Sequence, residues 1–156
     1  MSHDNRFLSE TETAVPIVHP PGDGRKVGVI GGESTFKVLS EQTGGAYAIL
    51  EQLVPPGHGP PLHVHRHETE IFYILEGTFE MRLAEVTIPA PAGTMVVGPR
   101  DIPHTFKNVG SSTGKLLLTV IPGRFSNYFL DVDNVPAADR DTIRALCAKY
   151  GVELLE

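Results

Sequence analysis

The sequence has a single cysteine and no long apolar run, and each shortage excludes a class of protein. Because Cys147 stands alone, the chain can form neither an intramolecular disulfide nor a cysteine-based zinc site, so any metal ion would be held by nitrogen and oxygen. No apolar stretch is long enough to span a bilayer, and the first residues lack the pattern of a signal peptide. We therefore expect a cytoplasmic location and no membrane partner.

Basic residues are also scarce, with 13 Lys and Arg against 19 Asp and Glu, for a net charge of −6. Proteins that bind nucleic acid need a clustered cationic face, and no such cluster appears, so we expect no nucleic-acid partner. A chain of 156 residues has the length of one domain, which buries about 70% of the surface that the unfolded chain exposes.

Turn-forming residues divide the chain into short segments, since 16 glycines and 13 prolines separate stretches rich in Val, Ile, Phe, Tyr and Thr. From Thr78 to Leu83 apolar and polar residues alternate, as in a strand with one buried face. Many short strands favour a sandwich or barrel over a parallel α/β sheet. The predicted strands are Val27–Ile30, Thr35–Leu39, Ala46–Val54, Leu62–His65, Glu70–Leu75, Thr78–Ala84, Val86–Ile88, Thr94–Val97, His104–Asn108, Lys115–Ile121 and Tyr128–Val132.

The C-terminal segment alone has helical spacing. Four apolar residues recur there at offsets 0, 3, 4 and 7, namely Ile143, Leu146, Cys147 and Tyr150. Asp133 or Asn134 is the expected cap, Pro136 suits the first turn, and Gly151 ends the helix. The predicted organisation is an arm or edge strand at 1–26, a β-barrel at 27–132 and a helix packed on the barrel at 133–156.

Histidines and glutamates gather between two of these strands. His63 and His65 are two residues apart on a predicted strand, so both imidazoles project from one face, and strand parity would add His67. Parity would put Glu68 and Glu70 on the opposite face unless the chain turns between His65 and Glu70. The spacing thus permits three histidines on one strand, or two histidines with a glutamate that returns after a hairpin turn.

The other N-terminal and loop histidines, His3, His19 and His58, have no partner at ligand spacing and are read as ordinary polar residues.

Two segments resemble the signature motifs of the cupin superfamily. The first motif is Gly, five residues, His-x-His, four residues, Glu, six residues and Gly, and it is met by Gly57, His63, His65, Glu70 and Gly77. The second is met by Gly93, Pro99, His104 and Asn108, with Asp101 where the family usually has glycine. The departure at Asp101 affects a turn and no ligand. The spacing of 15 residues between the motifs is that of compact single-cupin proteins.

The resemblance implies an all-β fold, a double-stranded β-helix (the cupin jelly-roll barrel) with a short C-terminal α-helix. It implies that His63, His65, Glu70 and His104 bind one divalent transition metal, with Fe, Mn, Ni, Co, Cu and Zn all open. His67 then becomes a turn residue. It also implies a homodimer, in which the N-terminal arm at Phe7–Arg25 extends the partner's sheet.

The chain resembles in particular the small cupins related to quercetin dioxygenase. That resemblance implies an oxygenase acting on a small apolar or aromatic enol or phenol, with Glu70 also serving as catalytic base. We expect Phe72, Ile74 and Phe106 to line the substrate pocket, because they share the inward face with the ligands. Gly123, Phe125 and Phe129 could cap the barrel, but plain packing is the preferred interpretation. The alternatives are a non-oxidative isomerase, cyclase or decarboxylase and a non-catalytic module that binds a small molecule.

Overall fold

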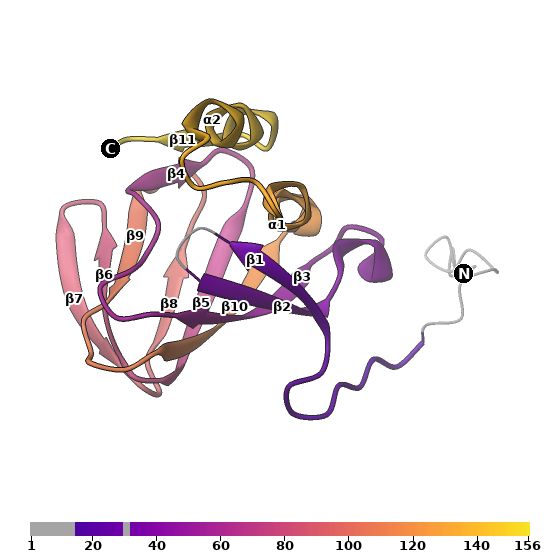
Figure 1. Cartoon of the computed structure of the whole chain (residues 1–156), viewed down its shortest axis with the longest axis horizontal. Helices are drawn as coiled ribbons and strands as arrows, with labels where there is room; N and C mark the ends of the chain where they lie inside the picture. The colour runs from indigo at the N-terminus through magenta and orange to yellow at the C-terminus, as the bar shows by residue number, and fades with distance from the viewer. Residues whose placement is uncertain (1–14, 30–31) are drawn as a thin grey trace, which may run out of the picture.

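Two antiparallel sheets face each other in the computed structural model, which describes residues 15–29 and 32–156 (Figure 1). The first sheet has the strand order β1 (Arg25–Val29), β2 (Gly32–Val38), β3 (Ala48–Val54), β10 (Gly114–Ile121), β5 (Thr69–Glu76) and β8 (Met95–Gly98). The second has the order β11 (Val152–Leu154), β4 (His63–His65), β9 (His104–Asn108), β6 (Thr78–Leu83) and β7 (Val86–Pro91). The predicted all-β jelly-roll class is confirmed.

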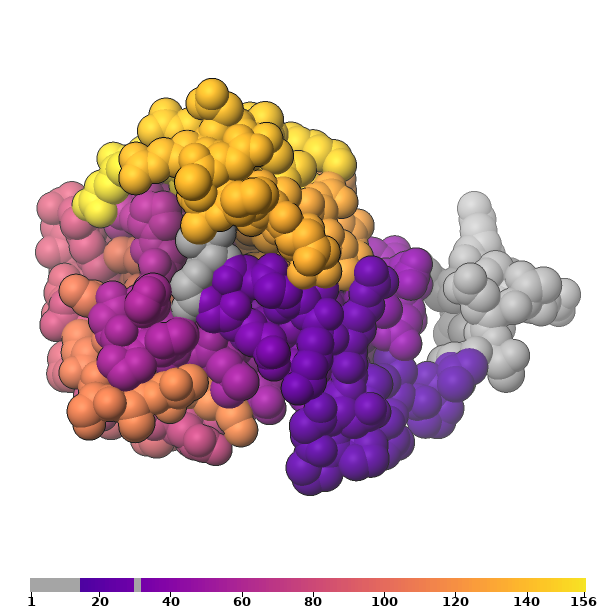
Figure 2. Space-filling model, viewed as in Figure 1, coloured from indigo at the N-terminus to yellow at the C-terminus, as the bar shows by residue number. Residues whose placement is uncertain are grey.

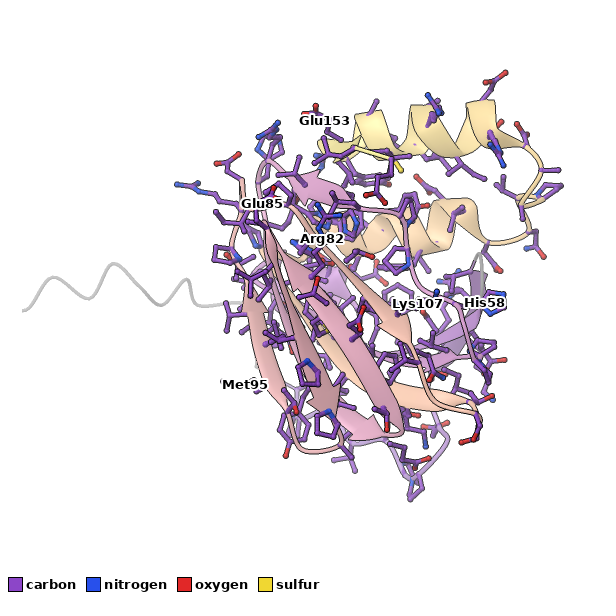
Figure 3. The ribbon with its side chains drawn as sticks, turned by 90° about the vertical axis from the view of Figure 1, so that its left-hand side faces the viewer. His58, Arg82, Glu85, Met95, Lys107 and Glu153 are labelled. Carbon is purple, nitrogen blue, oxygen red and sulfur yellow. The ribbon has the colours of Figure 1, made fainter. Side chains whose placement is uncertain are left out.

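The core lies between the sheets and is built by the inward residue of each pleat. On β6 the predicted alternation holds, since Phe79 and Met81 are fully buried, and Leu83 is partly buried. On β5 the buried positions are Glu70, Phe72 and Ile74. The outward residues stay in solvent, as Met95 on β8 illustrates in Figure 3 with 63% exposure. Burial therefore follows the period of two that the sequence showed.

The C-terminal part of the chain covers one end of the barrel (Figures 1 and 2). The 3₁₀ turn Gly123–Ser126 leads into α1 (Asn127–Val132), and α2 (Arg140–Lys149) follows. The strand predicted at Tyr128–Val132 is wrong, because that segment is the helix α1. Its apolar residues are consecutive and lack the alternation of a half-buried strand, so strand propensity alone misled the prediction.

The terminal helix begins later than predicted. Asp139 caps α2, and its side chain accepts a hydrogen bond from the Thr142 backbone N–H at 3.1 Å. Asn134 instead adopts a left-handed conformation with φ of 68°, in the turn between α1 and α2. Gly151 ends the helix as expected, with φ of 70°. No helix in the described ranges is long and apolar enough to cross a membrane.

The N-terminal arm is described only from Val15 onward, so most of the predicted arm, and the end of the first predicted strand at Ile30, lie outside the described residues. The described part, residues 15–24, runs away from the barrel (Figure 2). Val15 and Val18 are 78% and 82% exposed there. The arm thus presents apolar side chains to solvent before β1 begins.

The second predicted motif holds its loop together through Asn108 and Asp101. The fully buried Asn108 donates to the Val54 and Ser112 carbonyls at 2.7 and 2.9 Å. Asp101, which stands where the motif has glycine, takes a positive φ of 65°, a conformation that Asp tolerates better than most residues. Its carboxylate lies 3.2 Å from the Arg66 guanidinium, and its backbone N–H donates to the His65 carbonyl at 2.8 Å.

Candidate metal centre

Three strands carry the four predicted ligands into the space between the sheets. His63 and His65 come from β4, where they are two residues apart and share the inner face. His104 opens β9 and is the antiparallel partner of His63. Glu70 comes from β5 in the opposite sheet. The turn between His65 and Glu70 is therefore a crossing from one sheet to the other, and not the hairpin that the sequence suggested.

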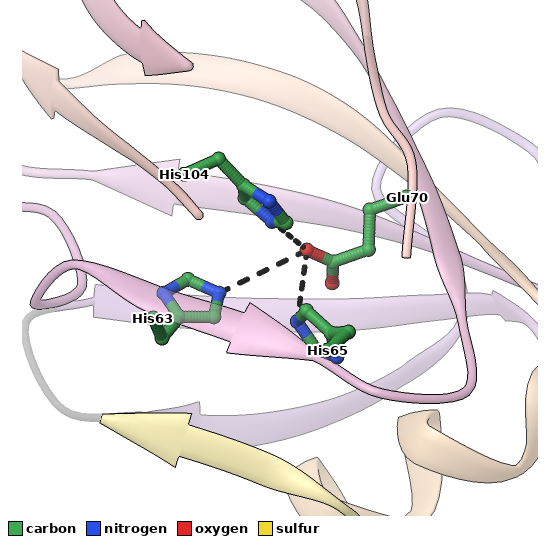
Figure 4. Close-up of side chains that lie close together, drawn as sticks. All are labelled: His63, His65, Glu70 and His104. Atoms are coloured by element: carbon green, nitrogen blue, oxygen red, sulfur yellow. Dashed lines mark hydrogen bonds and ion pairs between the residues drawn. The ribbon is translucent and has the colours of Figure 1, made fainter. Parts of the chain in front are cut away.

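The four side chains converge on a single point, with one ligand atom of each lying within 4.8 Å of the others (Figure 4). One carboxylate oxygen, Oε2 of Glu70, is the common neighbour. It lies 2.9 Å from Nε2 of His104, 3.1 Å from Nε2 of His65 and 4.0 Å from Nε2 of His63. All four residues are buried. The structure thus brings together the set that the motifs named.

The outer nitrogens of the histidines are held by neighbouring groups. Nδ1 of His63 lies 2.8 Å from the Pro61 carbonyl, and Nδ1 of His104 lies 3.0 Å from the Ile102 carbonyl. In a neutral imidazole, donation from Nδ1 to a carbonyl leaves the lone pair of Nε2 for an ion, whereas with no ion bound Nε2 of His104 forms a hydrogen bond with Oε2 of Glu70 at 2.9 Å. Two of the three imidazoles are therefore oriented as metal ligands by their own backbone.

His65 is placed differently, because a carboxylate lies behind it. Nδ1 of His65 is 3.6 Å from Oε2 of Glu68, a side chain that is only 2% exposed. Strand parity had put Glu68 on the outer face, but the turn that carries the chain between the sheets also turns Glu68 inward. Glu68 lies behind the cluster and is not among its four converging residues.

Burial and charge act on the cluster in opposite directions. Burial lowers the pKa of His63 to about 4, so this imidazole is neutral at ordinary pH. Burial would also lower the pKa of His65, but the carboxylates of Glu70 and Glu68 raise it to about 9. Burial would raise the pKa of Glu70, yet the imidazoles of His65 and His104 hold it well below its usual range. Without an ion, these shifts favour a charged pair of protonated His65 and ionised Glu70.

The residues fit a divalent transition metal. Three nitrogens and one carboxylate oxygen suit Fe, Mn, Ni, Co, Cu or Zn, whereas Mg²⁺ and Ca²⁺ prefer oxygen ligands. Both ring nitrogens of the buried His65 lack a hydrogen-bond partner of good geometry, although Glu70 is only 3.1 Å away. The His65 ring and the Glu70 carboxylate are therefore placed as two groups that both face a third atom, and not as a hydrogen-bonded pair. The chain thus has a His/Glu cluster able to bind a metal ion.

A cavity of about 480 Å³ extends from this cluster toward the C-terminal helices, within the usual range for small-molecule sites. His63 and Glu70 lie in its wall at the inner end, beside the rings of Phe72 and Phe106. The Phe72 ring packs edge-on against both His104 and Phe106. Ile74 is fully buried in the core and is not among the described residues that line the cavity.

The C-terminal segment supplies the opposite wall, through Phe125, Tyr128 and Phe129. The Phe125 ring lies edge-on to His65 with 4.4 Å between ring centroids. It also stacks on Tyr128. Packing alone had been the preferred interpretation of Phe125 and Phe129, and the structure adds that both rings face the cavity that holds the cluster.

The remaining histidines of the described residues stay away from the cluster. His67 is exposed and packs beside Gly151, where an added Cβ would lie 2.6 Å from its ring. His58 is at the surface in the loop before β4 (Figure 3). His19 pairs with Asp23 at 2.8 Å. His3 lies outside the described residues.

Sequence reasoning missed Glu68 as a neighbour of the cluster. The available signal was its position three residues after His65, in a turn that brings a carboxylate back toward the ring. That signal is weak because it depends on the direction of the turn, which no glycine or proline between His65 and Glu70 specifies.

Comparison with known proteins identifies the fold family. Residues 50–121, which contain all four converging side chains, match the family model described as a cupin domain. A solved structure from Thermotoga maritima, titled a predicted oxalate decarboxylase, is 26% identical with a TM-score of 0.55. The match covers 58% of this chain and 80% of that one.

Curated proteins match as well. Quercetin 2,3-dioxygenase of Bacillus subtilis is 27% identical over 118 residues, or 74% of this chain and 34% of that protein. Polyketide synthase CurC of Streptomyces cyaneus is 28% identical over 93 residues, or 60% of each chain. The chain spans from about a third to three fifths of the length of the curated relatives it matches. Residues 50–121 are therefore a cupin domain, in a chain that resembles the quercetin dioxygenase-like members of that superfamily.

Proposed function

We propose that this cupin is a metal-dependent oxygenase acting on a small apolar or aromatic enol or phenol. The observation that carries the proposal is the cavity, whose aromatic walls lead directly to a buried set of three histidines and one glutamate. The likeness to the Bacillus subtilis quercetin 2,3-dioxygenase supports the choice of reaction, although it extends over about a third of that protein.

The chain's own residues would divide the work between binding and proton transfer. A divalent metal held by the cluster would acidify a coordinated hydroxyl and mediate electron transfer between substrate and O₂. Phe72 and Phe106 would hold an aromatic ring beside the cluster and keep water out. Glu70 is ionised at neutral pH, so it could accept the hydroxyl proton at the oxygen that none of the three histidines faces (Figure 4).

Metal binding is the first test. Protein reconstituted with Fe²⁺, Mn²⁺, Ni²⁺, Co²⁺, Cu²⁺ or Zn²⁺ should retain about one ion per chain after desalting. Glu70→Gln and His104→Ala should lose that ion. His67→Ala is the matched control. This imidazole lies in the turn between His65 and Glu70, but it is exposed and outside the cluster. Failure of every metal to bind would refute the proposal, and loss of the ion on replacing His67 would favour the three-histidine strand.

Oxygen consumption is the second test. An oxygen electrode with a panel of flavonols and β-diketones should record uptake by the metal-loaded protein and none by Glu70→Gln. Product formation that continues unchanged without oxygen would point to a non-oxidative isomerase, cyclase or decarboxylase. Ligands that raise the melting temperature without any product would point to a binding module.

A further inference from the structure

The outer end of the cavity is made by residues that follow the matched cupin domain at 50–121. Helix α2 contributes Ile143 and Cys147 to the wall, next to Tyr128 and Phe129 of α1. Helix α2 also places two arginines, Arg140 and Arg144, in the lining. They are four residues apart and therefore lie on one face of the helix. The cupin domain thus supplies the cluster end of the cavity, whereas Val29, Gly32 and the C-terminal segment supply the walls that lie outside that domain.

The two arginines have charges available for a ligand. Within residues 15–29 and 32–156, neither makes an ion pair or a side-chain hydrogen bond. Two other arginines are engaged: Arg66 pairs with Asp101 and Glu153, and Arg82 pairs with Glu156 at 3.2 Å. Glu156 is the acidic residue at the outer end of the cavity, and that pairing already occupies it. Two uncompensated cations thus meet at one opening of a chain whose net charge is −6.

The cavity therefore has three chemical zones in sequence. The inner zone is the metal-binding cluster, the middle zone is aromatic, and the outer zone carries two guanidinium groups. Each guanidinium presents a planar fork of N–H donors that matches a carboxylate. Apart from the cluster residues and Gln52, the charged and amide groups in the lining lie at the outer end, namely Arg140, Arg144 and Glu156. A neutral apolar substrate would leave both arginines without a partner.

We propose that the substrate is an amphipathic acid: a metal-binding hydroxyl or enol at one end, an aromatic or apolar body, and a carboxylate at the other end bound by Arg140 and Arg144. This inference rests on the proposed function only for the metal-binding end of the substrate. The carboxylate end is argued from the two arginines alone. The sequence analysis expected the C-terminal helix only to pack on the barrel, and the structure places two arginines of that helix in the lining of the cavity.

A matched pair of ligands tests the carboxylate. We would measure the Kd of 3-(3,4-dihydroxyphenyl)propanoate and of its methyl ester by calorimetry, on zinc-loaded protein at low ionic strength. The acid should bind about tenfold more tightly than the ester, as expected for hydrogen bonds to a charged group at a partly exposed site. The preference should fall below about twofold in Arg140→Gln/Arg144→Gln. Raising the salt concentration should also reduce it, because the arginines are exposed.

The control variant also removes two positive charges, but from arginines outside the cavity. Arg25→Gln/Arg100→Gln removes two exposed arginines that do not line the cavity, and it should keep the full preference for the acid. The proposal is overturned if the wild-type protein binds acid and ester equally, if neither member of the pair binds, or if the preference survives in Arg140→Gln/Arg144→Gln.

A second pair separates this inference from the proposed function. 3-Phenylpropanoate and its methyl ester lack the ring hydroxyls, so their binding to metal-free protein does not depend on the cluster. A preference for the acid that disappears in Arg140→Gln/Arg144→Gln would support the arginine site even if no metal bound. Equal affinities here, with normal metal uptake, would refute the arginine site and leave the metal centre standing.

Discussion

Glu68 should control how tightly the cluster binds its metal, although it is not one of the four converging residues. Its carboxylate lies 3.6 Å from Nδ1 of His65, and both side chains are almost fully buried. Two full charges at that separation interact with about 4 to 5 kcal/mol at an effective dielectric constant of about 20. A metal-bound imidazole carries only part of a charge, so Glu68→Gln should weaken metal binding by about 10- to 100-fold, the range for outer carboxylates.

The assay is a competition for Zn²⁺ or Co²⁺ between the protein and a fluorescent chelator. Glu76→Gln is the matched control, because Glu76 is exposed at the end of β5, the strand that begins directly after Glu68, and pairs only with Lys115 in the described structure. Circular dichroism would show that both variants fold. A Kd for Glu68→Gln within about twofold of the wild-type value would refute the reasoning, as would an equal loss in Glu76→Gln.

The aromatic wall, the buried imidazoles and the N-terminal arm each support a further prediction. Phe125→Ala should lower the free energy of unfolding in urea by about 3 to 5 kcal/mol, because the ring is buried among aromatic side chains, and a loss below about 1 kcal/mol would contradict this. In metal-free protein His65 has a pKa of about 9, against about 6.5 when unfolded, so its contribution to stability should be complete below pH 6.5 and disappear as the pH rises to about 9. Urea titrations of the wild type and His65→Gln would show no difference in pH dependence over that window if the reasoning failed. Because Val15 and Val18 are exposed on the arm, we propose a homodimer that becomes monomeric when residues 1–24 are deleted, and light scattering that found a monomeric full-length chain would exclude it.

The barrel could be predicted because turn residues mark its strand ends and alternation marks its inner face. The class of fold followed from those two signals, and the motif spacing named four side chains that the structure brings together. The predictions that were wrong concern segments whose structure depends on packing against residues far away in the sequence. The segment Tyr128–Val132 has strand-forming residues, but it follows the turn at Gly123–Ser126 and folds as a helix against α2. Local propensity does not include such packing.

The short strand β11 lay beyond what periodicity can detect. Val152–Leu154 has only three residues, and its strand conformation comes from pairing with His63–His65 on β4. Glu68 was missed for a related reason, since the face on which it lies depends on the path between two sheets. Arg140 and Arg144 gave no signal in the sequence, because a pair of arginines on a helix usually faces solvent. Their proposed role follows from the structure, in which both arginines of α2 line the cavity.

The pairing of β11 with β4 has a consequence for how the metal centre is made. Arg66, directly after β4, and Glu153 on β11 are 87 residues apart in the chain. A ribosome adding about 5 to 20 residues per second needs about 4 to 17 s to cover that distance. During that interval the edge of β4 that β11 covers has no partner strand. The four converging residues end at His104, so all of them are synthesised before the strand that closes this edge.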